Sequence, residues 1–345
     1  MSKPASKTIR TLRILMPLIG LSCLIYFTPW VLLKAWLEPL KPTIQEEIDH
    51  FIGYGFDGVI VYVEHAGEAP LYLASGYHNT ATKTPADPHA LFKIASIGKL
   101  YNAAAVTKLV AAGQLSLDKS LADYLQSYKD DIAFADQITL RMLVQHRSGI
   151  PNVTQTPDFW VNPPKNRTEA LARVLNLPAD FTPDADYAYS NTNYMLIEEI
   201  IANVLGHEPF IFIQQSILYP LGLNNTYASI HDVELDRLMS GYYVGVEEDI
   251  KTTDYGSMVA NAEDVGLFIR ALNTDLLFDE DEKEIYENLY KLEHTGLIPG
   301  YQSIAKYHKE LDTVVVQFTN TTNFDGYDWT LSEILYSRII KMIST

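Results

Sequence analysis

The order of its secondary-structure patterns is the feature of this chain that most restricts its fold. Two apolar segments typical of strands, "GVIVYVEHAG" and "PLYLASGY", follow a short amphipathic helix predicted over residues 42–55. Strand patterns return only near the end, in "YQSIAKYHK" and "LDTVVVQFTNTT", and helical patterns dominate between the two groups. Strands from both ends can pair in one antiparallel sheet, with terminal helices on its faces and the helical block beside it. We therefore predict an α+β fold in which two subdomains meet at a cleft.

The length and composition allow one large globular domain or two modest ones. The 345 residues are 47% hydrophobic and 20% charged, which is ordinary for a folded domain of this size. We predict a single domain over residues 42–345. Its sheet subdomain would comprise about 42–95 and 240–345, and its helical subdomain about 96–239.

The charge of the chain excludes one class of partner. The formal net charge is −17, and the first 41 residues hold six basic residues and one acidic residue, so the remainder carries −22. A domain of this sign repels phosphate, and no basic stripe interrupts it. We expect no nucleic-acid partner.

An uncharged apolar run, "ILMPLIGLSCLIYFTPWVLL", occupies residues 14–33 and follows four basic residues, Lys3, Lys7, Arg10 and Arg13. At about 1.5 Å per residue, a helix of this length matches a hydrocarbon core about 30 Å thick. We predict a cytoplasmic basic tail over 1–13 and a transmembrane signal-anchor helix over 14–36. The chain would then be a single-pass membrane protein with its large domain in the periplasm or outside the cell.

A cleavable signal peptide, leading to secretion, is the alternative for this run, although its apolar region is usually only about 7–15 residues long. Cys23 is the only cysteine and lies inside the run, so no intrachain disulfide can form. Lipid attachment at Cys23 is a minor option.

Ser96 and Lys99 lie three positions apart in "FKIASIGKLYN", where a strand-like segment gives way to a helix that ends at Gly113. Residues three apart share a helix face. A serine becomes nucleophilic when a base takes its proton, and lysine can be that base where burial disfavours its charged form. The simpler alternative is a serine cap followed by a surface lysine. The same spacing in Ser116 and Lys119 is explained by a solvated loop.

Two further motifs follow along the chain. "YAYSNTNY" contains Tyr189 and Asn191 in a Y-x-N triplet before an apolar helix, and "EHTGLIPGY" contains His294, Thr295 and Gly296. The Y-x-N spacing occurs at two other places, but the H-T-G triplet occurs once. The structural alternatives are a core aromatic, a helix cap and an exposed strand histidine.

In this order, the S-x-x-K, Y-x-N and H-T-G motifs resemble those of the penicillin-recognising serine hydrolases, in the branch of class C β-lactamases and D-alanyl-D-alanine carboxypeptidases. Four further segments are similar to that branch: "LRMLVQHRSGIPN", "GQLSLDKSLADYL", "LYPLGLNNT" and "GSMVANAEDVGLFIRAL". The resemblance covers about residues 45–340. It implies a β-lactamase/transpeptidase-like fold.

The resemblance also implies roles for the residues of the first two motifs. Ser96 would be the acylated nucleophile, and Lys99 would share its proton. Tyr189 would act as general base or proton relay. Asn191 would hold Lys99 and a substrate amide.

The third motif would form one edge of the cleft. Thr295 would meet a substrate carboxylate or carbonyl, and beyond Gly296 the amide of Leu297 would pair with that of Ser96 as an oxyanion hole. His294 replaces the lysine of K-T-G, which leaves less permanent positive charge for a carboxylate and weakens the case for efficient β-lactam hydrolysis. Arg147 stands where a threonine is usual, next to the expected cleft wall.

From the resemblance we expect a serine hydrolase that forms an acyl-enzyme on Ser96, most simply a D-alanyl-D-alanine carboxypeptidase or related peptidase acting on peptidoglycan-type peptides. An esterase or a weak class C-like β-lactamase is the nearest alternative. A non-catalytic protein that binds or senses cell-wall fragments or β-lactams is the alternative of another class. The expected partners are a small peptide, ester or β-lactam substrate and, through the N-terminal helix, a membrane. We expect no cofactor and no metal, because the histidines lack paired ligand spacing.

Overall fold

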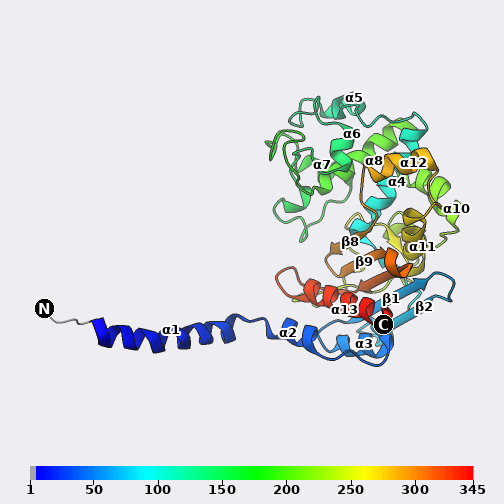
Figure 1. Ribbon diagram of the computed structural model, residues 1–345. Coiled ribbons are helices and arrows are strands. Elements are labelled where there is room, and N and C mark those ends of the chain that lie inside the picture. The colour runs from blue at the N-terminus through cyan, green and yellow to red at the C-terminus, as the bar shows by residue number, and fades with distance from the viewer. Residues whose placement is uncertain (1–4, 345) are drawn as a thin grey trace. The chain divides into compact units, whose positions relative to one another are not determined.

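The computed structural model describes residues 5–344 of the chain (Figure 1). By its internal contacts the chain divides into two compact units, and the boundary along the sequence falls between Leu40 and Lys41. Each unit is described separately below.

A six-stranded antiparallel sheet forms the centre of the larger unit, with the strand order β3-β2-β1-β10-β9-β8. Its members are β1 (Gly58–His65), β2 (Leu71–Asn79), β3 (Thr84–Pro85), β8 (His294–Ile298), β9 (Tyr301–His308) and β10 (Thr313–Thr319). The early and late strands join where β1 pairs with β10, with Val59 opposite Thr319 and His65 opposite Thr313. The predicted α+β class and the single sheet built from both ends of the chain are therefore confirmed.

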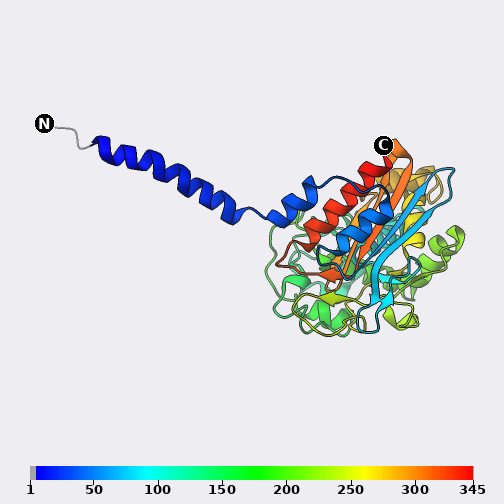
Figure 2. The same cartoon turned by 90° about the horizontal axis from the view of Figure 1, so that it is seen from below.

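Helices cover both faces of this sheet. On one face, α3 (Ile44–Ile52) and α13 (Asp328–Ile343) lie side by side across the strands (Figure 2). On the other face, α11 (Ala262–Asn273) packs on β1, β9 and β10. Gly266 of α11 permits this close approach, because a Cβ there would lie 2.3 Å from the ring of Tyr62.

The helical block lies beside the sheet (Figure 1). It comprises α4 (Gly98–Ala111), α5 (Leu121–Tyr124), α6 (Leu140–Val144), α7 (Arg167–Ala172), α8 (Asn191–Leu205), α9 (Pro209–Ile213), α10 (Tyr219–Leu221) and α12 (Glu280–Glu287). Its central helix is α4, which contacts α8, α9 and α12 and whose residues 103–105 are three fully buried alanines. Small side chains at these positions let the surrounding helices approach α4 closely.

Short strands connect the two parts. A three-stranded sheet joins β4 (Phe92–Lys93), β7 (Val259–Ala260) and β5 (Thr226–Tyr227), while β6 (Tyr242–Tyr243) pairs in parallel with β11 (Thr321–Thr322). Because only a short turn separates β4 from α4, this small sheet fixes the point at which the chain passes from the sheet side to the helical block.

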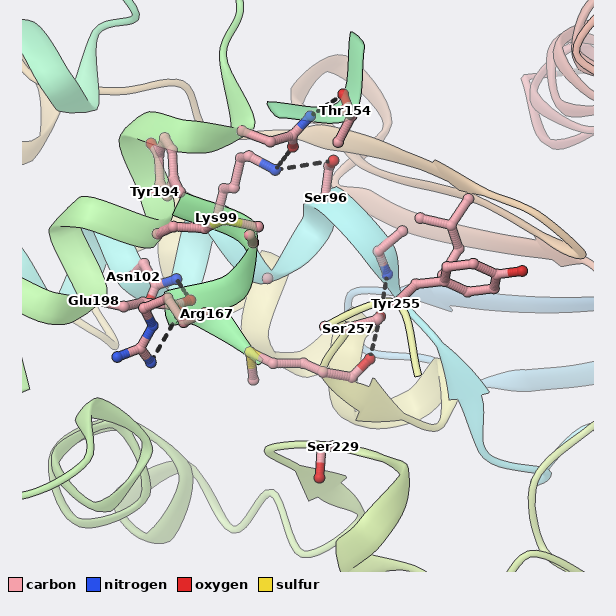
Figure 3. Close-up of a pocket in the computed structure, with 18 of the residues that line it drawn as sticks. Ser96, Lys99, Asn102, Thr154, Arg167, Tyr194, Glu198, Ser229, Tyr255 and Ser257 are labelled. Atoms are coloured by element: carbon pink, nitrogen blue, oxygen red, sulfur yellow. Dashed lines mark hydrogen bonds and ion pairs between the residues drawn. The ribbon is translucent and has the colours of Figure 1, made fainter. Parts of the chain in front are cut away.

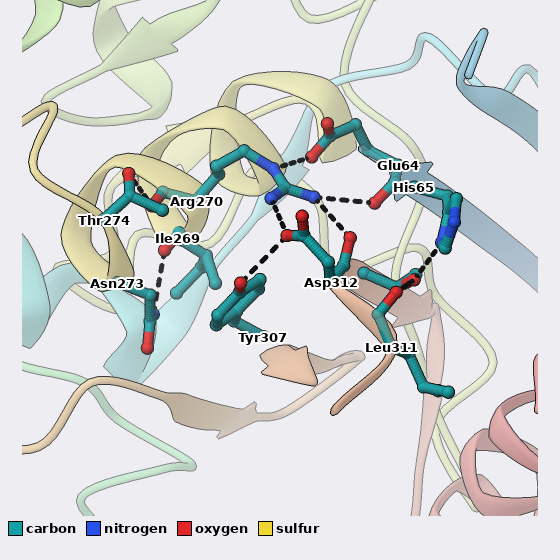
Figure 4. Close-up of polar contacts among 10 residues, drawn as sticks. Glu64, His65, Ile269, Arg270, Asn273, Thr274, Tyr307, Leu311 and Asp312 are labelled. Carbon is teal, nitrogen blue, oxygen red and sulfur yellow. Dashed lines mark hydrogen bonds and ion pairs between the residues drawn. The ribbon is translucent and has the colours of Figure 1, made fainter. Parts of the chain in front are cut away.

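An ion-pair cluster ties the end of α11 to the turns of the large sheet (Figure 4). Arg270 pairs with Glu64 at the end of β1 and with Asp312 in the turn between β9 and β10. Its guanidinium also donates to the backbone carbonyls of both partners, at 3.2 and 3.0 Å. The hydroxyl of Tyr307 donates to Asp312 at 2.9 Å. Both partners of Arg270 lie at or beside the ends of strands, so the cluster holds α11 on the sheet.

The smaller unit contains α1 (Ala5–Phe27) and α2 (Trp30–Leu37). In the described part of the chain, no helix taken alone is long and apolar enough to cross a membrane. Taken together, the two helices from Thr11 onward have the length and the apolar composition of a membrane span, but a bend of 74° separates them. The continuous helix predicted over 14–36 is thus interrupted before Trp30. Pro29 explains the break, because it lacks an amide hydrogen and disfavours helical geometry in the residue before it.

The membrane span and the cytoplasmic basic tail predicted over 1–13 remain predictions. Part of that tail, residues 1–4, lies outside the described residues.

Candidate active site

Ser96 lies in a tight 3-10 turn, Ala95–Ile97, between β4 and α4. The helix predicted from Ser96 therefore begins with this turn, and α4 proper starts at Gly98. Ala95 has φ of +50°, a left-handed conformation that costs a non-glycine residue about 1–2 kcal/mol. The amide of Ala95 donates to Oγ of Ser257 at 2.9 Å, which helps to hold the turn. Ser96 is thereby presented at a sharp corner of the chain.

Two segments that lie far apart in the sequence, residues 96–99 and 189–191, meet at the hydroxyl of Ser96. The contact between Ser96 and Lys99 is drawn in Figure 3. Nζ of Lys99 lies 3.1 Å from Oγ of Ser96, and the hydroxyl of Tyr189 lies 2.9 Å from the same oxygen. Lys99 also donates to Oδ1 of Asn191 at 2.8 Å. The structure therefore brings together the four residues of the first two motifs.

Lys99 is held among neutral groups. The residue is 9% exposed, and its Nζ lies 5.2 Å from the ring centre of Tyr189 and 5.5 Å from that of Tyr194. Aromatic faces attract an ammonium ion without accepting its proton. No carboxylate within residues 5–344 pairs with Lys99, so its polar partners are the side chains of Ser96 and Asn191.

Two residues that the sequence did not single out orient Asn191. Oδ1 of Asn152 accepts from the amide of Asn191 at 3.0 Å and from its Nδ2 at 3.3 Å. Nδ2 also donates to Oγ1 of Thr154 at 3.1 Å. Because the nitrogen of the side-chain amide is occupied in this way, its oxygen faces Lys99. Asn152 is the last residue of the segment "LRMLVQHRSGIPN". The similarity of this segment to the family was the only indication in the sequence that Asn152 belongs to the site.

His146 supports Tyr189 from behind. The two rings have centres 4.4 Å apart, and Nδ1 of His146 accepts from the amide of Ser190 at 3.2 Å. Burial, with smaller contributions from the charges of Lys99 and Lys291, lowers the pKa of His146 to about 3. This histidine is therefore neutral in the physiological range. The sequence excluded it only as a metal ligand.

Arg147 lies outside the cavity. Its guanidinium pairs with Asp184 and donates to the backbone carbonyl of the same residue. The position expected beside the cleft wall is thus engaged in a contact between a half-buried arginine and an exposed aspartate.

The edge strand β8 carries the third motif and packs against the turn that holds Ser96. A Cβ at Gly296 would lie 2.5 Å from the carbonyl oxygen of Ile94 and 2.3 Å from Oγ of Ser303. Glycine therefore allows the strand to reach the nucleophile turn. Thr295 and Leu297, on either side of it, line the same cavity as Ser96. The oxyanion role of the Leu297 amide stays a prediction.

His294 is buried at the inner side of this strand, with 5% of its surface exposed. Its Nε2 lies 3.1 Å from the hydroxyl of Tyr290, and its Nδ1 contacts the carbonyl oxygen of Thr295. Burial, followed by the charges of Lys291 and Lys99, lowers the pKa of His294 to about 2. The imidazole is neutral and contributes no positive charge to the cavity.

The cavity has a volume of about 880 Å³ and extends well beyond Ser96. This size lies within the range of about 300–1,000 Å³ typical of small-molecule sites. Its far part contains Asn102, which donates to Glu198 at 2.9 Å, and Arg167, which pairs with Glu198 and Glu208 at 3.3 Å each (Figure 3). This far part could not be predicted from the sequence, because its residues come from α4, α7, α8 and the turn after α8.

The second S-x-x-K pair lies outside this site, and the described residues hold no cluster of metal ligands. Ser116 and Lys119, the second pair with S-x-x-K spacing, are exposed and do not line the cavity. Between residues 5 and 344, no group of three or more histidine, cysteine or carboxylate side chains is arranged to hold a metal ion.

A helical block beside an antiparallel sheet, with serine, lysine and tyrosine meeting at their junction, defines the class of β-lactamase/transpeptidase-like proteins. The family model described as Beta-lactamase matches residues 44–291, and this chain belongs to that family. The family predicted from the three motifs is confirmed.

Relatives of known sequence agree with this assignment. The chain is 25% identical to protein flp of Staphylococcus aureus (strain COL) over 267 residues, which cover 73% of this chain and 52% of that protein. It is 24% identical to penicillin-binding protein 4* of Bacillus subtilis (strain 168) over 316 residues, covering 86% and 63% respectively. The matches thus span about half to two thirds of these relatives' length.

Solved structures show the same fold. A D-amino acid amidase from Ochrobactrum anthropi SV3 superposes with a TM-score of 0.76 at 22% identity, over 87% of this chain and 97% of that one. A penicillin-binding protein from Bacillus halodurans gives 0.72 at 19% identity, over 87% and 100%.

Proposed function

We propose that this protein is a serine hydrolase that acylates Ser96 and then releases the acyl group to water. One observation carries the proposal. Oγ of Ser96 lies within hydrogen-bond distance of both Nζ of Lys99 and the hydroxyl of Tyr189, in a cavity that can hold a small peptide. This is the geometry expected of a nucleophile and its base.

The reaction would proceed in two stages. In the first, Lys99 and Tyr189 take the proton of Ser96 while Oγ attacks the substrate carbonyl carbon. The same proton then passes to the leaving nitrogen or oxygen as its bond to that carbon breaks, which leaves an ester on Ser96. In the second stage a water molecule gives a proton to the pair and attacks this ester, and Ser96 departs with the proton. Amides of the Ser96 turn and of β8 would stabilise the oxyanion.

Peptidoglycan-type peptides ending in D-alanine are the substrates we propose first. An anchor formed by the apolar N-terminal run, with its N-terminus in the cytoplasm, would hold the large unit outside the cytoplasm and near the cell wall. The similarity to penicillin-binding protein 4* of Bacillus subtilis supports the same class. Carboxypeptidase activity would remove the terminal residue.

Hydrolysis of neutral esters or amides is the second candidate. The neutral state of His294 favours it, because this residue replaces a permanent cation of the K-T-G motif. The amidase from Ochrobactrum anthropi shares the fold and is named for amide hydrolysis. Weak β-lactamase activity is a separate alternative, since β-lactams such as penicillins carry a carboxylate.

Covalent labelling of the full chain in detergent tests the proposal. We expect a fluorescent penicillin or a fluorophosphonate to add to the protein once, at Ser96, with intact mass and peptide mapping as the readout. Ser96→Ala should remove the adduct. A rapidly lost penicillin adduct would indicate turnover, whereas no label on Ser96 with either reagent would support a non-catalytic binder and contradict the proposal. Release of D-alanine from a peptide, compared with cleavage of a p-nitrophenyl ester, then ranks the two candidates.

A further inference from the structure

Lys291 is a cation of the cavity that the proposed reaction does not use. It lies three residues before His294, in the segment that leads into β8, and lines the cavity together with His294 and Thr295. The residue as a whole is exposed. Its charge contributes to the lowered pKa values of both His146 and His294.

Burial and nearby charged groups change the pKa of Lys291. Partial burial of the ammonium lowers the pKa of Lys291, Tyr189 opposes that change, and Lys99 adds to it. Weaker effects come from Glu293, which favours the charged form, and from Lys306, which disfavours it. Tyr189, which contacts Ser96, is therefore among the groups that interact electrostatically with Lys291.

No carboxylate among the described residues forms an ion pair with Lys291. Nearby cations do have such partners: Lys306 pairs with Glu293 at 3.0 Å, and Lys108 pairs with Glu282 at 2.8 Å. The nearest aromatic contact of its Nζ, to the ring of Tyr290, is long at 5.9 Å. In a protein with a net charge of −17, an unpaired cation at the cavity leaves room for an anion from outside the chain.

The residues near Lys291 do not supply a free positive charge for binding an anion. His294 is neutral, and Lys99 is engaged with Ser96 and Asn191. Thr295 can donate one hydrogen bond but carries no charge. The part of the cavity next to β8 therefore depends on Lys291 for the recognition of an anion.

We infer that Lys291 binds a carboxylate of the substrate beside Thr295 and so selects substrates with a free carboxylate near the scissile bond over neutral esters and amides. The inference rests on the proposed acylation of Ser96 and decides between its two candidate substrate classes. Lys291 acts here as a specificity determinant and takes no part in proton transfer.

A matched pair of substrates tests this in the full chain: an N-acylated D-alanyl-D-alanine peptide with a free C-terminal carboxylate, and the same peptide with a C-terminal carboxamide. Loss of a hydrogen bond to a charged group corresponds to about 10- to 100-fold. We expect Lys291→Gln to lower kcat/KM by this factor for the carboxylate peptide, mainly through KM, and to leave the carboxamide within about twofold. Lys291→Arg should retain most of the preference because it keeps the charge.

Lys306→Gln is the control, since Lys306 lies on the adjacent strand β9 and already has a partner in Glu293; it should leave the ratio of the two substrates unchanged. An equal loss for both peptides in Lys291→Gln, or no loss for either, would overturn the inference. Fluorophosphonate labelling distinguishes a failure of the proposed acylation of Ser96 from a failure of the role inferred for Lys291. An unlabelled Ser96 in the wild type removes the proposed function itself, whereas a labelled Ser96 without any carboxylate preference removes only the role of Lys291.

Discussion

Two buried lysines, Lys93 and Lys99, lie on either side of Ser96 and differ in what they contact. Lys93 is 1% exposed and donates to the backbone carbonyls of Ile250, at 3.3 Å, and Thr253, at 2.7 Å. Lys99 is 9% exposed and contacts the side chains of Ser96 and Asn191. A lysine that donates to backbone carbonyls holds the chain in place, whereas a lysine that contacts a serine hydroxyl can exchange a proton with a reactive group. The contact partner of a buried lysine, more than its burial, therefore indicates whether the lysine has a structural or a catalytic role.

The environment of Lys93 is consistent with a structural role. Burial lowers the pKa of Lys93 to about 7, an effect that the charges of Asp254 and Asp249 only partly oppose. Its Nζ also lies 4.7 Å from the ring centre of Tyr301 and 5.5 Å from that of Tyr255, a residue that lines the cavity. Lys93 thus holds the segment that leads to one wall of the cavity.

The largest expected effect comes from Lys99→Met. Methionine has a similar length but cannot exchange a proton, so we expect acylation of Ser96 to slow by about 10⁴-fold, the upper end of a general-base contribution. The unfolding temperature should change little, because Lys99 pairs with no carboxylate. Stopped-flow measurement with a p-nitrophenyl ester and a thermal melt would check both results. Retained acylation in a folded Lys99→Met protein would remove the distinction between the two lysines.

The matched change, Lys93→Met, should alter stability and leave the chemistry almost intact. Two carbonyls lose their donor, which destabilises the fold by about 1–3 kcal/mol at pH 9. We expect kcat/KM of the folded variant to stay within about threefold of the wild type, since Lys93 does not touch Ser96. A loss of activity as large as that of Lys99→Met would contradict the comparison.

The pH dependence of this difference has a definite sign. The pKa of Lys93 is about 7 in the folded protein and 10.5 ordinarily, so between these values the unfolded chain binds the additional proton. The contribution of Lys93 to the free energy of unfolding therefore rises with pH from about 7 to 10.5. We expect the gap between wild type and Lys93→Met to narrow from pH 9 to pH 6 in denaturant titrations. A gap that is constant over this range would show that Lys93 keeps its proton on folding.

The smallest effect is expected from His294→Gln, which tests a third buried basic residue beside the site. Glutamine can keep the contact with Tyr290, and a histidine with a pKa of about 2 is already neutral at working pH. The rate should change less than about threefold, and the acid limb of kcat/KM should stay in place.

Stability at acid pH should respond instead. As pH falls below the ordinary value of 6.5, the unfolded chain protonates His294 and the folded protein does not, so wild type loses stability that His294→Gln retains. A shifted acid limb in the variant would show that His294 is charged in the working enzyme.

The part of the site that could be predicted from the sequence is the part with fixed local geometry. Ser96 and Lys99 are one helical turn apart, so their proximity follows from spacing alone. Tyr189 and Asn191 required the family resemblance, because nothing in the spacing of 93 residues places them near Ser96. Within the fold, alternating apolar runs were sufficient to predict that early and late strands share one sheet.

Other residues of the site could not be predicted because their roles depend on the packing of distant segments. Asn152 and Thr154 matter only because Asn191 lies against them, and His146 only because Tyr189 covers it. Lys291 stands out only because it lines the cavity and forms no ion pair with a carboxylate of the described residues. The break before Trp30 could have been expected from Pro29, but an uncharged run alone does not distinguish one helix from two.

The tight contact at Gly296 requires a residue without a side chain at this position. Position 296 offers no functional group, yet a single added methyl would force the outermost strand away from the corner that presents the hydroxyl. Displacements near 1 Å can cost about 10²-fold in rate. Evolution of new substrate preferences in this scaffold would therefore have to work around that glycine, through the cavity walls farther from the corner.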